Sequence, residues 1–284
     1  MISIIIPVYN QYSSLVKVLR AFTVQTINSD KCEFIIIDDG SADELCNCSF
    51  IECAESLNYK IVHTKNRGRA AARNVGIQES RGELLIFCDA DRFPNPDFIN
   101  QHLKSHQKEA DIVIGASYDY FGKENYVNNN INWYVIEKFS RLPLYFKKTA
   151  SLYDEKGQTM SKLSWLSFLV GNSSIKRSVI ENAGGFDESF VEWGFEHFDL
   201  AYRLYCSGYR FSLNKDAINY HIPHPRQEGF YRQAIVSNAK KFCDKYPEVC
   251  EEMLAGYIAG SIDNDTAENS IYILNSREVR DEYK

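Results

Sequence analysis

An apolar segment of this chain, Leu84 to Cys88, runs directly into two carboxylates that lie one residue apart. In an extended strand successive side chains alternate faces, so Asp89 and Asp91 are expected to project to the same side. Two carboxylates on one face repel each other unless a cation lies between them, and oxygen ligands of this kind suit Mg²⁺ or Mn²⁺. Such ions commonly bridge a carboxylate to a diphosphate. The pattern predicts a site for a metal ion and a diphosphate, although the tripeptide Asp89-Ala90-Asp91 would also suit a strand end that is exposed to solvent.

The elements that must position this pair alternate in type over the first 115 residues. Expected strands are 2–7, 33–38, 60–64, 84–88 and 112–116, and expected helices are 13–25, 70–80 and 96–108. That order predicts an α/β fold with βαβ units, in which a mostly parallel, Rossmann-like sheet is flanked by helices. Ligands of open sheets bind beyond the carboxyl ends of the strands. Three polar clusters fall there, Tyr9-Asn10, Asp38-Asp39-Gly40-Ser41 and Asp89-Ala90-Asp91.

The pattern is less regular beyond residue 116. Residues 117–165 contain a basic and aromatic stretch, Arg141 to Lys148, which suits either a lid or acceptor-binding insert or a long surface excursion. A helix is expected at 231–246, where Pro247 ends it, and a second helical segment follows.

Composition limits the possible partners. A chain of 284 residues with 44% hydrophobic residues can form one large α/β domain with additions. The formal net charge of −6 offers no general attraction for nucleic acid, so no such partner is expected. No segment approaches the roughly 20 apolar residues of a membrane span, and the N-terminus lacks a signal-peptide pattern. A soluble, cytoplasmic protein with reduced cysteines is expected.

Four motifs occur in a fixed order along the chain: Ile4 to Asn10, Ile35 to Ser41, Asn66-Arg67-Gly68 with Ala72 to Gly76, and Asp89-Ala90-Asp91. Their combination resembles glycosyltransferase family 2, enzymes of GT-A fold that move a sugar from a nucleotide diphosphate to an acceptor with inversion. The resemblance implies a GT-A domain over 1–225, with a nucleotide-binding half at 1–115 and an acceptor-side half at 116–225. Residues 226–284 would form a C-terminal helical extension.

The resemblance also implies a donor site. Asp39 would accept a hydrogen bond from a uracil N3–H or a ribose hydroxyl, while Asp38 would share this role or cap an Asx turn. Arg67 and Arg73 flank a turn that opens a helix, where guanidinium groups suit a base or a diphosphate, and one of the two is expected to pair with a structural carboxylate instead. The implied nucleotide-sugar-binding residues are Pro7, Tyr9, Asp38, Asp39, Arg67, Arg73, Asp89, Asn172 and Trp193, the last equally suited to the core.

A histidine is implied to complete the metal site of Asp89 and Asp91. The segment Asn-Tyr-His-Ile-Pro-His offers two candidates, of which His221 is preferred over His224. Imidazole beside carboxylates favours Mn²⁺ over Mg²⁺.

The acceptor side resembles the galactosyl- and N-acetylhexosaminyl-transferring branch of the family, through Gly184-Gly185-Phe186-Asp187 and the Trp-Gly-Phe-Glu segment that ends at Glu196. Inverting transfer needs a group that takes the acceptor's proton. The family normally has Glu-Asp here, whereas this chain has Glu196-His197. We predict Glu196 as the carboxylate nearest the acceptor, with His197 as a competing base. Asp199 would lie behind them, and its spacing of four from Arg203 also suits a structural pair.

The expected function is metal-dependent transfer of a hexose or N-acetylhexosamine from a UDP-sugar to a glycan or glycoconjugate acceptor, in surface polysaccharide biosynthesis. Association with the inner face of a membrane is compatible with this role. A nucleotide-sugar-binding module with weak catalysis is one alternative, because His197 departs from the family pattern. A sugar nucleotidyltransferase is another, but the Gly-rich basic loop that it needs is replaced by Tyr9-Asn10-Gln11-Tyr12. The acceptor, the linkage and the oligomeric state are not specified by these residues.

Overall fold

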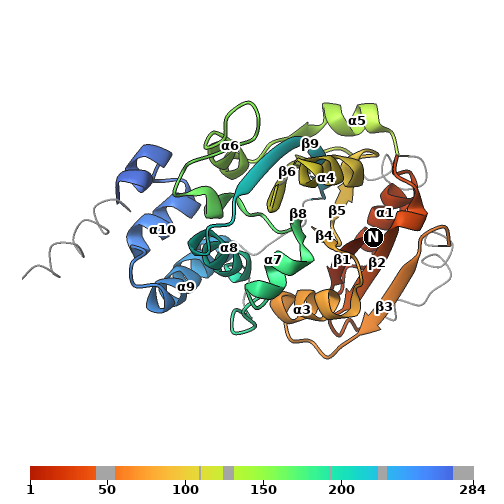
Figure 1. Ribbon diagram of the computed structural model, residues 1–284, viewed down its shortest axis with the longest axis horizontal. Helices are drawn as coiled ribbons and strands as arrows, with labels where there is room; N and C mark the ends of the chain where they lie inside the picture. The colour runs from red at the N-terminus through yellow and green to blue at the C-terminus, as the bar shows by residue number, and fades with distance from the viewer. Residues whose placement is uncertain (43–54, 109, 124–130, 192–193, 223–228, 271–284) are drawn as a thin grey trace, which may run out of the picture.

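A nine-stranded sheet runs through the computed structural model and carries helices on both faces (Figure 1). The structure describes residues 1–42, 55–108, 110–123, 131–191, 194–222 and 229–270. The strand order is β3-β2-β1-β4-β8-β6-β9-β5, and β7 pairs with β6. The strands are β1 Ile2–Val8, β2 Cys32–Asp38, β3 Tyr59–His63, β4 Leu84–Cys88, β5 Arg92–Pro94, β6 Ile112–Tyr120, β7 Ser140–Arg141, β8 Asn172–Lys176 and β9 Phe211–His221.

Six of these nine strands, β1, β2, β3, β4, β6 and β9, point the same way, and β5, β7 and β8 run against them. The prediction of a mostly parallel α/β sheet is therefore confirmed. The register pairs Val8 with Asp38 and Ile5 with Phe87, so β1, β2 and β4 end at one edge of the sheet. The polar clusters that follow these strands meet at that edge, as expected for an open sheet.

The sheet separates the core into two layers, each covered by helices. The helices are α1 Tyr12–Thr23, α3 Arg69–Glu79, α4 Phe98–Gln107, α5 Trp133–Lys138, α6 Leu144–Ala150, α7 Arg177–Asn182, α8 Glu196–Cys206, α9 Phe230–Lys245 and α10 Glu251–Ala259. Ile4 and Ile6 of β1 pack in the cluster that includes Leu15 of α1, whereas Ile5 faces the opposite layer with Ile77 of α3. This alternation along a fully buried central strand is why both faces need helices.

The sequence analysis missed two strands that shape the site. Strand β8 begins Asn-Ser-Ser and lacks an apolar pattern, yet it lies between β4 and β6 with those side chains buried. Hydrogen bonds replace apolar packing there, because His102 and His106 of α4 each contact the Ser174 hydroxyl at 2.8 Å. Strand β5 is only three residues long and pairs Arg92 with His221 of β9.

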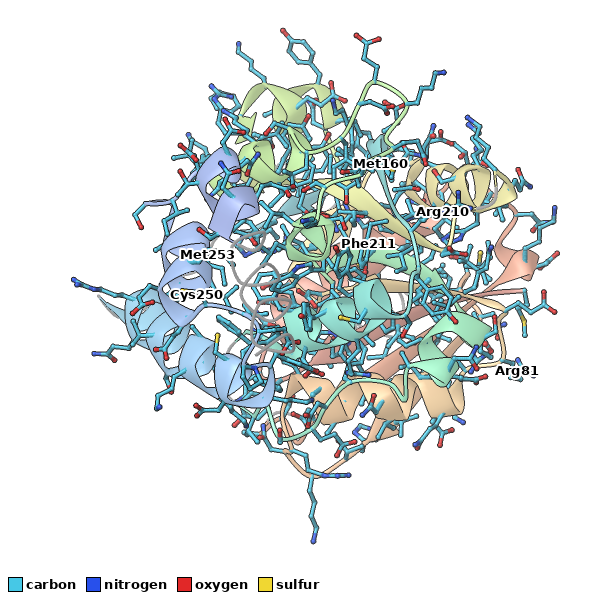
Figure 2. The ribbon with its side chains drawn as sticks, turned by 60° about the vertical axis from the view of Figure 1, so that its left-hand side comes forward. Arg81, Met160, Arg210, Phe211, Cys250 and Met253 are labelled. Atoms are coloured by element: carbon cyan, nitrogen blue, oxygen red, sulfur yellow. The ribbon has the colours of Figure 1, made fainter. Side chains whose placement is uncertain are left out.

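The C-terminal helices are part of the main core. The predicted helix and its break before Pro247 are confirmed by α9 and α10. Phe242 of α9 is fully buried and stacks on Trp165 with ring centroids 5.5 Å apart. Figure 2 shows Met253 of α10, and Cys250 just before this helix, on the flank opposite Arg81. In Figure 1, α9 and α10 lie at the far side of the molecule from β2 and β3. None of the helices in the described ranges combines the length and hydrophobicity needed to cross a bilayer.

This packing predicts that the C-terminal extension unfolds together with the sheet. Phe242→Ala is expected to lower the free energy of unfolding by about 3 to 5 kcal/mol, because it leaves a cavity against Trp165. Val236→Ala, on an exposed face of the same helix, is expected to change it by less than about 0.5 kcal/mol. Urea denaturation followed by circular dichroism measures both. Equal effects of the two substitutions would show that α9 is not part of the core.

Candidate active site

The ends of β1 and β2 form an ordered pair of loops. Asp38 accepts hydrogen bonds from the Ser41 backbone N–H, three residues further on, and from the His63 Nδ1, both at 3.0 Å, so its carboxylate caps the turn that follows β2. Asp39 accepts hydrogen bonds from the backbone N–H groups of Arg67 and Gly68, each at 2.9 Å. Both carboxylates are buried. In this structure Asp39 holds the turn that opens α3, whereas Asp38 links the end of β2 to His63 at the end of β3. Their predicted contacts with a nucleotide would use the remaining lone pairs.

An aromatic side chain lies open to solvent beside these loops. Tyr9 follows β1 and is 49% exposed, whereas Pro7 stays within the strand opposite Ile37. The next residue, Asn10, has a φ of 52° and links the two loops: its backbone N–H donates to the Ser41 hydroxyl, and its side-chain oxygen accepts the Ala42 N–H. The Tyr9 ring is thus placed where a planar base could stack at the sheet edge.

Both predicted arginines pair with carboxylates, whereas the sequence analysis expected this of only one. Arg67 is exposed and forms an ion pair with Glu188. Arg73 is buried, and its guanidinium joins two acidic groups: Nη2 lies 2.9 Å from Asp89 Oδ1, and Nη1 lies 2.8 Å from Glu196 Oε1. The Arg73 fork therefore connects the predicted donor carboxylate to the predicted base, which argues against its direct contact with a diphosphate.

The charges of this group stabilise one another. Burial lowers the pKa of Arg73, but Asp89 and Glu196 raise it by more, so the guanidinium stays charged. Burial likewise raises the pKa of Glu196. The neighbouring His197 and the positive charges of Arg73 and Arg69 outweigh that effect and hold the pKa of Glu196 well below its ordinary value. Glu196 is therefore a carboxylate at any physiological pH.

The two aspartates of the Asp-Ala-Asp motif have different surroundings. The prediction of an extended backbone through Asp89 and Asp91 is wrong, because the Arg92 N–H donates a hydrogen bond to the Asp89 carbonyl at 3.0 Å and closes a turn. Asp89 contacts Arg73 on one oxygen, and its other oxygen lies 3.6 Å from Arg92 Nε. A side chain at position 171 would clash with this carboxylate, since a Cβ on Gly171 would lie 2.4 Å from Asp89 Oδ2.

Asp91 faces the predicted histidine. Its Oδ2 accepts a hydrogen bond from Gln11 Nε2 at 3.2 Å and lies 3.8 Å from His221 Nε2. The other ring nitrogen of His221, Nδ1, lies 2.9 Å from Asp119 Oδ1. A carboxylate that accepts the Nδ1–H fixes the tautomer in which Nε2 carries the lone pair, which is the usual arrangement behind a metal-binding histidine. The antiparallel β5 and the β6–β9 register bring these residues together.

In the part of the chain that the structure describes, two of the predicted metal ligands face each other. Asp91 Oδ2 and His221 Nε2 lie 3.8 Å apart, whereas Asp89 contacts two arginines. Among the residues that the structure describes, no group of three or more His, Cys, Asp or Glu side chains is arranged to hold a metal. Oxygens of a diphosphate and water would have to complete the shell of six that Mg²⁺ prefers. His224 and Trp193 lie outside the described residues.

Glu196 and His197 begin helix α8. The preceding Gly194 and Phe195 both have positive φ, 85° and 72°, and this sharp turn directs the start of the helix toward Arg73. Glu196 Oε2 is buried and has no hydrogen-bond partner among the described groups. His197 Nδ1 lies 3.7 Å from Glu196 Oε1, and its ring packs on Phe198. The two candidate bases are therefore neighbours.

Two of the predicted site residues are structural in this arrangement. Asp199 is fully buried and contacts Arg203, Lys245 and Tyr246, so the pair suggested by its spacing to Arg203 is present. Asn172 is buried as well: its amide donates to the Ala116 and Ala217 carbonyls and accepts from His102. With all of its polar positions taken by the protein, we leave Asn172 out of the proposed donor site.

Sequence reasoning missed Asp119, Gln11 and Arg92, because none belongs to a recognisable motif. A cavity of about 330 Å³ lined by Glu33, Lys60 and Arg81 lies at the opposite edge of the sheet, where β2 and β3 begin. We place the site at the converging carboxylates instead, since that edge combines buried charge, an unpartnered Glu196 oxygen and the strand ends.

Comparison with known families covers these same residues. The family model described as glycosyl transferase family 2 matches residues 3–182, which include the four ordered motifs. The chain belongs to glycosyltransferase family 2. A second model, described as the N-terminal domain of galactosyltransferase, matches residues 154–225 and thus the segment around Glu196. The resemblance seen in the sequence is confirmed, and the chain is a transferase enzyme.

Relatives and solved structures agree with this family. The uncharacterized glycosyltransferase YfnE of Bacillus subtilis is 27% identical over 284 residues, covering 87% of this chain and 71% of that protein. Validoxylamine A glucosyltransferase of Streptomyces hygroscopicus subsp. jinggangensis is 27% identical over 274 residues, covering 89% of this chain but only 63% of that protein. The crystal structure of S. aureus TarS 1–349 in complex with UDP-GlcNAc has a TM-score of 0.62 at 16% identity, covering 90% of this chain and 70% of that one. At that identity the likeness shows the fold alone, a GT-A fold.

The Arg73 fork predicts an unequal effect of two matched substitutions. Arg73→Met is expected to lower the free energy of unfolding by about 3 to 5 kcal/mol, because it leaves two close carboxylates without their buried partner. Arg67→Met removes only an exposed pair and is expected to cost about 1 kcal/mol or less. Chemical denaturation at neutral pH measures both. A small loss in the Arg73 variant would mean that Asp89 and Glu196 do not depend on it.

Proposed function

We propose that this family 2 member is a metal-dependent, inverting glycosyltransferase that transfers a hexose or N-acetylhexosamine from a UDP-sugar to a glycan or glycoconjugate acceptor, in surface polysaccharide biosynthesis. One observation carries the proposal: the Arg73 fork joins Asp89 to Glu196 at the sheet edge where Asp91 faces His221. The residues that we assign to the sugar donor therefore lie next to Glu196, the residue that we assign to the acceptor. The glucosyltransferase relative and the UDP-GlcNAc complex of TarS support the nucleotide-sugar donor.

The donor would lie across the loops that follow β1, β2 and β4. Tyr9 offers its exposed ring to the base, and Asp38 and Asp39 offer carboxylate oxygens to uracil or ribose. Asp91 and His221 would hold Mn²⁺ or Mg²⁺, with Asp119 orienting the imidazole. When bound, the ion neutralises the charge that develops on the departing diphosphate.

Glu196 lies on the acceptor side of this site. As the acceptor hydroxyl attacks the anomeric carbon opposite the diphosphate, its proton passes to Glu196 or His197, the bond from the anomeric carbon to the diphosphate oxygen breaks, and UDP leaves. The unpartnered Oε2 of Glu196 is the oxygen available for this proton. Burial raises the pKa of Glu196, but His197, Arg73 and Arg69 together lower it by more, which keeps the carboxylate ionised and reduces its basicity. His197 therefore remains a competing base.

The metal assignment predicts that transfer needs Asp91 and His221 together. Asp91→Asn and His221→Ala are expected to abolish Mn²⁺-dependent UDP release from UDP-sugars, and Asp119→Asn to weaken the apparent Mn²⁺ affinity about 10- to 100-fold. Asp216→Asn, an exposed change on the same strand β9, serves as the control.

Three other outcomes separate the alternatives. Full activity in EDTA would refute metal dependence. Mn²⁺-dependent binding of UDP-sugars without UDP release, even with candidate acceptors, would identify a binding module. Pyrophosphate formation from UTP and a sugar phosphate would identify a nucleotidyltransferase.

The base assignment predicts loss of rate without loss of donor binding. Glu196→Gln keeps the side-chain shape and is expected to lower kcat by at least about 100-fold. Binding of UDP-sugar, measured by calorimetry with Mn²⁺, should persist. Glu181→Gln on the exposed face of α7 is the matched control. Near-normal turnover of the Glu196 variant would remove Glu196 from this role, and full activity of His197→Asp would show that no imidazole is required.

A further inference from the structure

Helix α9 of the C-terminal extension contacts the polypeptide on both sides of Glu196. Lys245 Nζ lies 2.6 Å from Asp187 Oδ2, which precedes Glu196 in the chain, and 2.6 Å from Asp199 Oδ1, which follows it in α8. One ammonium group therefore joins the loop that leads into α8 to the first turn of that helix. Charge-assisted contacts of this length are strong, and Asp199 is fully buried.

Further hydrogen bonds support the connection that Lys245 makes between this loop and α8. The Tyr246 hydroxyl donates to the same Asp199 oxygen at 2.8 Å, while Arg203 Nε donates to the other oxygen at 3.0 Å. Lys241 of α9 donates to the Ser189 carbonyl in the loop. From the other side, Asn74 of α3 donates to the Phe186 carbonyl at 2.9 Å. The loop is thus held between α3 and α9.

The same helix also packs on the strained residue before Glu196. Phe195 has a φ of 72°, a region that is unfavourable for a side chain of this size. Its ring is buried, 5.4 Å from the Phe198 ring and 6.1 Å from the Phe242 ring of α9. Packing from the C-terminal extension therefore supports the backbone turn that orients Glu196.

Both partners of the Lys245–Asp187 ion pair are charged at neutral pH. Burial raises the pKa of Asp187, but the hydrogen bonds from Lys245 and Ser189 lower it by more, so that the pKa falls to about 2. Burial lowers the pKa of Lys245, but its bonds to Asp187 and Asp199 raise it well above the ordinary value. Lys245 is 37% exposed, so substitution there removes the link without opening a large cavity.

We propose that Lys245 is a positioning residue for catalysis: it links the C-terminal extension to the loop and helix that present Glu196, so that the extension sets the geometry of the acceptor-side base. This inference rests on the proposed function, in which Glu196 and His197 receive the acceptor's proton. Lys245 itself contacts neither of them.

The test compares Lys245→Met with Lys245→Arg and with Lys240→Met. Lys240 lies on the same helix, is exposed and pairs only with Asp244 among the described residues. Lys245→Met is expected to lower kcat by about 10- to 100-fold, as displaced catalytic groups do, while KM for the UDP-sugar and the calorimetric affinity for UDP with Mn²⁺ stay unchanged. Lys245→Arg should restore most of the rate, and Lys240→Met should behave like the unmodified chain.

A second measurement does not depend on activity. Hydrogen exchange of peptides covering 186–191 and 194–200 should accelerate in Lys245→Met but not in Lys240→Met. A kcat near that of the unmodified chain, or a loss of donor affinity in step with the loss of rate, would overturn the proposal. If the unmodified chain releases no UDP from any UDP-sugar, the proposed function fails, and unchanged exchange would then overturn the Lys245 link separately.

Discussion

A single buried guanidinium, that of Arg73, sets the arrangement on which the rest of the site depends. It lies between Asp89, at the end of β4, and Glu196, at the start of α8, two groups more than 100 residues apart in the chain. Arg73 and Glu196 are buried, whereas Asp89 is partly exposed. Burying charges is unfavourable unless they are paired with good geometry, so loss of either carboxylate would leave the buried guanidinium with an incomplete set of partners. The pairing ties helix α3 and the end of strand β4 to the start of helix α8.

The same logic recurs one helical turn further along α8. Asp199 is buried with no solvent contact, and its oxygens are shared by Arg203 of its own helix and by Lys245 and Tyr246 of α9. Helix α8 is therefore fixed at its first residue by α3 and one turn later by the C-terminal extension. A short helix that begins at a strained turn needs such outside support, because its own hydrogen bonds contribute little stability.

On the donor side the controlling constraint is strand register. The antiparallel pairing of β5 with β9 and the parallel pairing of β6 with β9 place His221 between Asp91 and Asp119. A shift of one residue in either pairing would turn His221 to the opposite face of the sheet. Asn172 stabilises this region from within, since its amide bridges β6 and β9 and accepts a hydrogen bond from α4. The polar interior strand β8 thus supports the edge of the sheet that carries Asp91 and His221.

The sequence by itself determined the α/β class, the strands β1 to β4 with their helices, the two C-terminal helices and the family. Each of these depends on local periodicity or on motifs of a few adjacent residues, which neighbouring positions encode directly. Only the tertiary structure decided the partners of the charged groups. Asp39 binds the backbone of the turn before α3, and Arg67 and Arg73 both form ion pairs with carboxylates. Asp199 binds Lys245 of α9, and Asp119 contacts the Nδ1 of His221. Those choices depend on distances between elements remote in the chain, and a charged side chain carries no local signal of which partner it will meet.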